Sequence, residues 1–159
     1  MHGLLVRLGV RTRDVPDVVQ RVLLAVHGQW STYDTARPLR AWLRSFVQRS
    51  ASDYRKRSSV LHEDVTLDGT VAAQEHDHLP SADVALEAEE RRTLLLEALE
   101  TLDFDRRTVL VLVEFEGVPV PEIAAMLGLP VPTVHSRLRF ARIDIAAAVR
   151  RLSAQRGQP

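Results

Sequence analysis

Apolar residues recur at a helical spacing in the segment from residue 17 to residue 30. They fall four positions apart, with two more beside the same stripe: Val18, Val22, Val26 and Trp30, flanked by Val19 and Leu23. A continuous stripe of this kind predicts an amphipathic helix that packs on a core. Pro16 suits the first turn of such a helix, and Asp14 or Asp17 can cap its start.

A second helical pattern runs through residues 37–58. Its inward positions advance in steps of one, three or four: Leu39, Trp42, Leu43, Phe46, Val47, Ser50 and Tyr54. The opposite stripe is polar and basic, and further cations extend it: Arg44, Gln48, Ser52 and Arg55, with Arg40, Arg49, Lys56 and Arg57. This face is either simply solvated or bound to nucleic acid. Small polar residues among the arginines favour the second, because such a face touches phosphates and leaves room for bases.

Residues 81–117 predict two more helices. The first places three leucines on one face and has two candidate caps: Leu95, Leu99 and Leu102, with Ser81 or Asp83. The second, "DFDRRTVLVLVEFEG", is ambiguous, because its β-branched run is also compatible with a buried strand. Asp103 or Asp105 near its start and Gly117 at its end favour the helix.

The segment "PEIAAMLGLPVPTVHSRLRFAR" has the pattern of a helix-turn-helix. Gly128 provides the turn, and Pro132 suits the first turn of the second helix. The inward residues of the two helices are Ile123, Ala124 and Leu127, then Val134, Leu138 and Ala141. The residues left to face outward are Thr133, His135, Ser136, Arg137, Arg139 and Arg142. A plain pair of antiparallel helices is the alternative that the pattern leaves open.

The charge distribution divides this all-helical pattern into two units. Residues 1–57 hold 11 Lys and Arg against 4 Asp and Glu, whereas residues 58–90 hold 9 acidic residues and no Lys or Arg. We therefore predict an all-α protein with two small helical domains, residues 1–57 and 83–159, joined by an acidic flexible linker at residues 58–82. The basic N-terminal block indicates an anionic partner.

Composition excludes several classes of function. The chain has no cysteine, which rules out disulfides and thiolate metal sites. The longest apolar run, residues 109–113, is far too short to cross a bilayer, so we expect a soluble cytoplasmic protein without membrane insertion. No nucleotide loop or catalytic triad stands out, and the pair His76 and His78 lacks further ligands. We expect no enzyme activity, no cofactor and no metal.

Taken together, these segments resemble the extracytoplasmic-function sigma factors of bacterial RNA polymerase. Three stretches carry the resemblance: "DVVQRVLLAV", "RPLRAWLRSFVQRSASDYRKR" and, most specifically, "EIAAMLGLPVPTVHSRL". Their order and spacing are stronger evidence than any one of them. The resemblance implies a transcription initiation factor that binds core RNA polymerase and directs it to specific promoters.

The resemblance also implies roles for individual residues. Asp17, Gln20 and the neighbouring Arg21 match the helix that grips core polymerase. The basic residues between Arg40 and Arg57 match the segment that binds and melts the downstream promoter element. The outward residues of the final helix, from Thr133 to Arg142, match the segment that enters the major groove of the upstream element. Members of this family are often held by an anti-sigma factor, which is therefore an expected partner.

Some residues depart from the family pattern. Arg21 stands where an acidic residue is usual, Arg49 where Asn is usual, and Phe140 where a basic residue is common. The chain also begins late compared with the family, and Pro119 takes the place of a capping Ser or Thr. These departures leave two alternatives open. One is a degenerate sigma-like interaction module, and the other is a classical helix-turn-helix regulator that binds DNA without polymerase.

Overall fold

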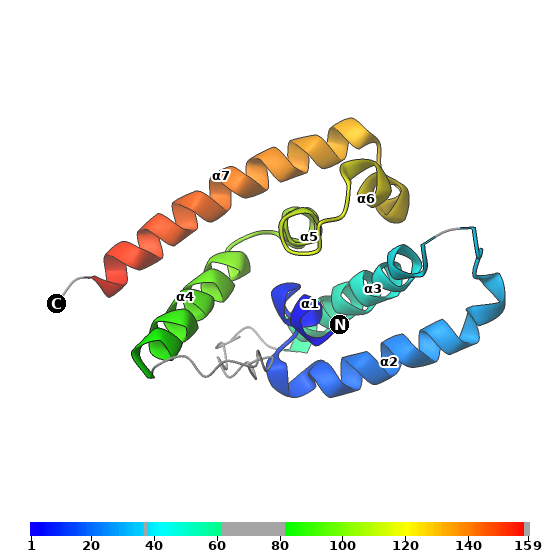
Figure 1. Cartoon of the computed structure of the whole chain (residues 1–159), viewed down its shortest axis with the longest axis horizontal. Helices are drawn as coiled ribbons and strands as arrows, with labels where there is room; N and C mark the ends of the chain where they lie inside the picture. The colour runs from blue at the N-terminus through cyan, green and yellow to red at the C-terminus, as the bar shows by residue number, and fades with distance from the viewer. Residues whose placement is uncertain (37, 62–81, 158–159) are drawn as a thin grey trace.

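The computed structural model describes residues 1–36, 38–61 and 82–157. Within these ranges every regular element is a helix (Figure 1), so the predicted all-α fold is confirmed. The α-helices are α1 (His2–Arg7), α2 (Val15–Gly28), α3 (Leu39–Leu61), α4 (Ala82–Glu100), α5 (Phe104–Glu114), α6 (Val120–Leu127) and α7 (Val131–Arg156), with short 3-10 helices η1 (Thr12–Asp14) and η2 (Trp30–Thr32). No described helix is both long and apolar enough to cross a membrane.

Helices α1 to α3 form an N-terminal unit whose core is built on the buried face of α2. Val18, Val22 and Val26 are buried as predicted, but Leu23 and Trp30 are 53% and 56% exposed. The predicted apolar stripe is therefore too wide, because α2 ends at Gly28 and Trp30 lies in η2 beyond it.

Residue Asp14 precedes α2 at the capping position, but its carboxylate does not cap the helix. It instead accepts a hydrogen bond of 2.6 Å from the hydroxyl of Tyr54 in α3. This contact ties the start of α2 to α3, and Pro16 occupies the first turn of α2 as predicted.

Helices α4 to α7 form a C-terminal unit with α5 at its centre. The ambiguous segment is a helix, and the carboxylate of Asp103 caps it by accepting from the backbone N–H of Arg106 at 2.9 Å. Residues 107–112 are all buried. Because α5 is covered on nearly every side, its sequence lacks the polar face that would have distinguished it from a strand.

The predicted helix-turn-helix consists of α6 and α7. Gly128 ends α6 in the left-handed conformation, with φ of 65°, and Pro132 lies in the first turn of α7. Val134, Leu138 and Ala141 are buried and dock α7 on the unit. As expected from the sequence, Pro119 precedes α6 without capping it through a side chain.

The two units pack directly on each other. In Figure 1, α1 and α3 of the N-terminal unit face α5 and α6 of the C-terminal unit at the centre of the molecule. The buried apolar residues of both units belong to one continuous cluster. The intervening sequence contributes helix at both ends, since α3 continues to Leu61 and α4 begins at Ala82.

Three predictions fall outside the described residues. They are the central part of the acidic linker, the candidate cap Ser81, and the histidine pair at residues 76 and 78. Among the residues that the structure does describe, no group of three or more side chains is arranged to hold a metal ion.

Candidate nucleic-acid and polymerase interface

The outward face of α7 carries the residues predicted to read DNA. His135, Ser136, Arg139 and Arg142 are exposed, and Thr133 is half-buried. These side chains lie on the side of α7 opposite the docked residues. The turn at Gly128 and the buried face of α7 therefore fix a row of polar and cationic groups on one rigid helix.

Two arginines of this row are held in ion pairs within the C-terminal unit. Arg137 Nη2 lies 2.6 Å from Asp105 Oδ2, and its side chain is only 28% exposed. Arg142 binds Glu114 Oε1 through Nε and Nη2, at 2.9 and 2.7 Å. Each ion pair orients a guanidinium but also competes with any external anion.

Phe140 adds an exposed aromatic ring to the same helix. It is 42% exposed, and the guanidinium carbons of Arg106 and Arg139 each lie 5.3 Å from its ring centroid. Cations at this distance from an aromatic face are attracted to it. Phe140 therefore makes a cation–π contact with each arginine, at a position where the sequence comparison expected a basic residue.

The basic face of α3 is divided between the C-terminal unit and solvent. Arg44 Nε lies 3.5 Å from Glu116 Oε2, and Arg55 Nη1 lies 3.2 Å from Glu100 Oε2. Gln48 also faces the C-terminal unit. The sequence predicted that this stripe of α3 is either solvated or bound to nucleic acid. It did not predict the contact with the C-terminal unit, which forms because the arginines meet carboxylates there.

The other polar residues of α3 are more accessible. Four of them are exposed and one is half-buried: Arg40, Arg49, Lys56 and Arg57, with Ser52. The guanidinium of Arg49 donates to the carbonyl oxygen and to Oγ of Ser45, each at 3.1 Å, and lies 4.7 Å from the Phe46 ring centroid. Arg49 is thus held flat against its own helix.

An aromatic cluster joins the end of α2 to the start of α3. The ring centroid of Trp42 lies 5.9 Å from that of Trp30, 5.0 Å from Tyr33 and 4.7 Å from Phe46. Trp42 is half-buried against the core, as its spacing predicts, whereas Trp30 is largely exposed. Sequence reasoning missed this cluster, although half of the eight aromatic residues lie between residues 30 and 46.

The outer surface of α2 carries the residues predicted to bind polymerase. Asp17, Gln20 and Arg21 are all exposed. Leu23 and Leu24 lie on the same helix and are 53% and 69% exposed. Two exposed leucines beside polar groups are typical of a protein-docking surface, which the sequence analysis missed by assigning Leu23 to the core.

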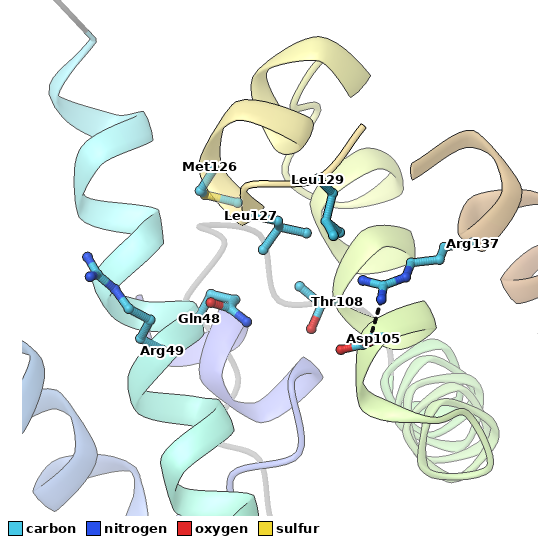
Figure 2. Close-up of a pocket in the computed structure, with 8 residues that line it drawn as sticks. All are labelled: Gln48, Arg49, Asp105, Thr108, Met126, Leu127, Leu129 and Arg137. Atoms are coloured by element: carbon cyan, nitrogen blue, oxygen red, sulfur yellow. Dashed lines mark ion pairs between the residues drawn. The ribbon is translucent and has the colours of Figure 1, made fainter. Parts of the chain in front are cut away.

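A cavity of about 370 Å³ lies between the two units. Figure 2 shows Gln48 of α3 facing Thr108 of α5, with Leu127 and Leu129 beside them, while the guanidinium of Arg49 points away. The hydroxyl of Thr108 is buried without a hydrogen-bond partner. The cavity brings a predicted downstream-element residue, Gln48, close to the predicted upstream reader Arg137.

Two groups have shifted pKa values, the buried Arg107 and the half-buried Tyr54. Burial lowers the pKa of the Arg107 guanidinium, and the neighbouring carboxylate of Glu100 partly offsets this effect. Burial also raises the pKa of the Tyr54 hydroxyl, and its hydrogen bond to Asp14 acts in the same direction.

Comparison with known proteins identifies both units. Residues 1–61 match the family described as Sigma-70 region 2, and residues 92–155 match Sigma-70, region 4. The RNA polymerase sigma factor CnrH of Cupriavidus metallidurans is 35% identical over 147 residues, which cover 87% of this chain and 75% of CnrH. The ECF RNA polymerase sigma factor EcfG of Rhodopseudomonas palustris is 33% identical, over 82% of this chain and 68% of EcfG.

The chain belongs to the extracytoplasmic-function sigma factors. The resemblance predicted from the sequence is confirmed, and so is the function of a transcription initiation factor. CnrH in complex with the cytosolic domain of CnrY has a TM-score of 0.65 and 28% identity, over 92% of this sigma factor and 77% of CnrH. The sigma factor RpoE of Bartonella quintana, solved with the anti-sigma factor NepR, shares the fold at 21% identity and a TM-score of 0.68, over 94% and 89% of the two chains.

Proposed function

We propose that this sigma factor divides promoter recognition between its two units, with α7 reading the upstream element and α3 acting at the downstream element. The observation that carries this proposal is the row of outward polar residues on α7, fixed by the Gly128 turn and by the buried Val134 and Leu138. A helix held in this way fits the width of a major groove.

Upstream recognition rests on the cationic and hydroxyl groups of α7. Arg137 and Arg139 donate to base edges, where each bidentate arginine–guanine contact supplies about 1–3 kcal/mol of discrimination. The remaining outward residues position the helix on phosphates: Thr133, His135, Ser136 and Arg142. Arg137 must break its ion pair with Asp105 before it can bind DNA. Until then, the pair orients the guanidinium on the surface of the C-terminal unit.

Downstream recognition and strand opening rest on α3. Its exposed cations, Arg40, Arg49, Lys56 and Arg57, attract the phosphate backbone, and each contact releases counterions. Opening requires no covalent chemistry from this protein, because binding to unpaired bases shifts the equilibrium of the duplex toward the open state. We accordingly assign it no enzymatic role and place its action in the cytoplasm, with the polymerase.

Polymerase binding rests on α2. Asp17, Gln20 and Arg21 form a polar border around the exposed Leu23 and Leu24. Apolar side chains with a polar border suit docking on another protein, where their burial drives association. Because the similar RpoE and CnrH were solved with NepR and with a domain of CnrY, we also propose an anti-sigma factor as a regulatory partner.

Two assays with purified core polymerase test this proposal. Co-elution with core polymerase, together with specific run-off transcripts, is the expected result. Co-elution without transcripts would instead support the degenerate interaction module suggested by Arg21 and Arg49. A DNA shift without co-elution would support a classical helix-turn-helix regulator.

A further inference from the structure

The outward face of α7 contains an exposed aromatic side chain among its polar ones. Residues at steps of three and four share the side of the helix opposite the docked residues: Thr133, Ser136, Phe140 and Ile143. Phe140 lies one turn after the exposed Ser136 and is itself 42% exposed. Its ring therefore lies among the residues proposed to enter the major groove, and not behind them.

Arg106 of α5 holds the ring of Phe140 in place. The guanidinium carbon of Arg106 lies 5.3 Å from the ring centroid. Arg106 Nη1 lies 2.6 Å from Asp144 Oδ2, and its Nε lies 3.1 Å from Asp103 Oδ2. Because two carboxylates of the C-terminal unit fix this cation, the ring packs against a fixed group. Arg106 is thus a positioning residue for Phe140, and less side-chain freedom is lost when the ring meets a ligand.

A phenyl ring distinguishes DNA bases by apolar contact, because it carries no hydrogen-bond donor or acceptor. In the major groove, guanine, adenine and cytosine present ring nitrogen, carbonyl or amino groups, whereas thymine also presents a 5-methyl group. Contact with that methyl group removes apolar surface of both partners from water. The same ring placed on an amino group or an acceptor covers a polar group without a hydrogen bond, which is unfavourable.

We propose that Phe140 is a specificity-determining residue and selects a thymine in the upstream promoter element through the 5-methyl group of that base. This inference rests on the proposed entry of α7 into the major groove and adds a base preference to it. The exposed Arg139, whose guanidinium carbon also lies 5.3 Å from the ring centroid, supplies a cation for the adjacent phosphate or base. The cation and the hydroxyl of Ser136 beside the ring favour DNA over a protein as its partner.

Selection from promoter fragments with randomised recognition elements tests this base preference, with the full chain bound to core polymerase. The wild-type protein should enrich thymine at one upstream position, and Phe140→Ala should lose that enrichment while it keeps the preferences at other positions. Phe115→Ala is the matched control. Phe115 is 38% exposed and its ring centroid lies 4.9 Å from the guanidinium carbon of Arg7, but it follows α5 and is not part of α7. This control should select the same sequences as the wild type.

A chemical change in the DNA then isolates the methyl group. Replacing the selected thymine by deoxyuridine removes only that group and should weaken wild-type binding about fourfold, which corresponds to the burial of one methyl group. Phe140→Ala should bind the two DNAs equally. Arg106→Ala should reduce the ratio between them, and Arg106→Lys, which keeps a cation near the ring, should restore part of it. Equal binding of both DNAs by the wild type would overturn the proposal.

The selection separates failure of this inference from failure of the proposed function. If the wild type enriches no base at any upstream position, the assignment of α7 to the groove is wrong, and the thymine preference is wrong with it. The same enrichment by the wild type and by Phe140→Ala contradicts only the role of Phe140. Weaker binding of Phe140→Ala to core polymerase, with unchanged base preferences, also contradicts that role and assigns the ring to a protein contact.

A second variant keeps the test decisive if Phe140→Ala loses helix content. Phe140→Gln retains a long side chain, and a glutamine amide binds adenine through two hydrogen bonds. The thymine enrichment should therefore disappear in this variant. Persistence of the thymine enrichment in folded Phe140→Gln would show that another residue makes the selection.

Discussion

The basic stripe of α3 and the outward face of α7 are both rich in arginine, but they have different surroundings. Arg44 and Arg55 of α3 meet carboxylates from the other unit, whereas Arg137 and Arg142 of α7 meet carboxylates from their own. Intra-unit pairs orient a side chain and leave the helix accessible, whereas inter-unit pairs cover it. Arginine on a helix face therefore indicates an anionic partner without revealing whether that partner is nucleic acid or the protein itself.

The largest expected effect comes from the buried arginine at the interface. Replacing Arg107 by Ala should destabilise the packed chain by about 3 kcal/mol, because the Glu100 carboxylate loses its buried cation and the Arg7 carbonyl loses its side-chain donor. Urea unfolding followed by tryptophan fluorescence measures this change. Arg106→Ala is the control, since its pairs with Asp103 and Asp144 are more exposed and contribute about 1 kcal/mol at most. Equal losses would contradict the central role of Arg107.

The next largest effect concerns the outward face of α7, which is predicted to bind the upstream element. Arg137→Ala should weaken binding to the upstream element by about 1–3 kcal/mol through loss of a base contact. Gel-shift titration and run-off transcription on one promoter provide the measurement. Arg150→Ala, an exposed change in the second half of the same helix, should leave both unchanged. Normal transcription by the Arg137 variant would show that the assignment of α7 to the major groove is wrong.

A smaller effect separates the two parts of the α3 face. Arg40→Ala should reduce the slope of log binding constant against log salt concentration by about 1, as expected for one lost phosphate contact. Arg44→Ala should lose less apparent affinity than Arg40→Ala, because it also removes a pair that holds the interface closed. DNA titrations at several salt concentrations distinguish the two, and a larger loss for Arg44 would show that its pair with Glu116 does not compete with DNA.

The smallest expected effect is a pH dependence within the N-terminal unit. The pKa of Tyr54 is raised in the folded protein, so the unfolded chain loses its phenolic proton first. Stability should therefore be complete below pH 10, the ordinary tyrosine value, and fall as the pH rises through the folded pKa. Urea midpoints across this range test the slope. Tyr54→Phe should flatten it, and an unchanged slope would assign it to another group.

Much of the local structure was predictable because it depends on neighbours in sequence. Gly128 and Pro132 mark the turn between α6 and α7, and Asp103 caps α5 as its position suggests. The limits of α2 were less clear, because the spacing of Leu23 and Trp30 fits a stripe that the helix does not bury. Apolar spacing shows which residues share a face and not how much of that face is covered.

The contact between units could not be predicted, because it depends on residues that lie 45 to 101 positions apart in the sequence. Arg106 and Arg107 are adjacent and chemically identical, but only Arg107 points at the end of α1. Charge counting assigned the cations of α3 to an external partner, since it cannot reveal that Glu100 and Glu116 lie opposite them. The individual roles of the predicted DNA- and polymerase-binding residues remain predictions.

The first helix of the helix-turn-helix, α6, depends on its neighbours for its helical structure. Helix α6 has only eight residues, with Pro119 before it, Pro121 in its first turn and no side chain to cap it. A segment this short does not sustain helical structure alone in water. Packing against α3, α5 and α7 stabilises its helical conformation. An excised peptide of residues 119–142 should therefore be largely unstructured.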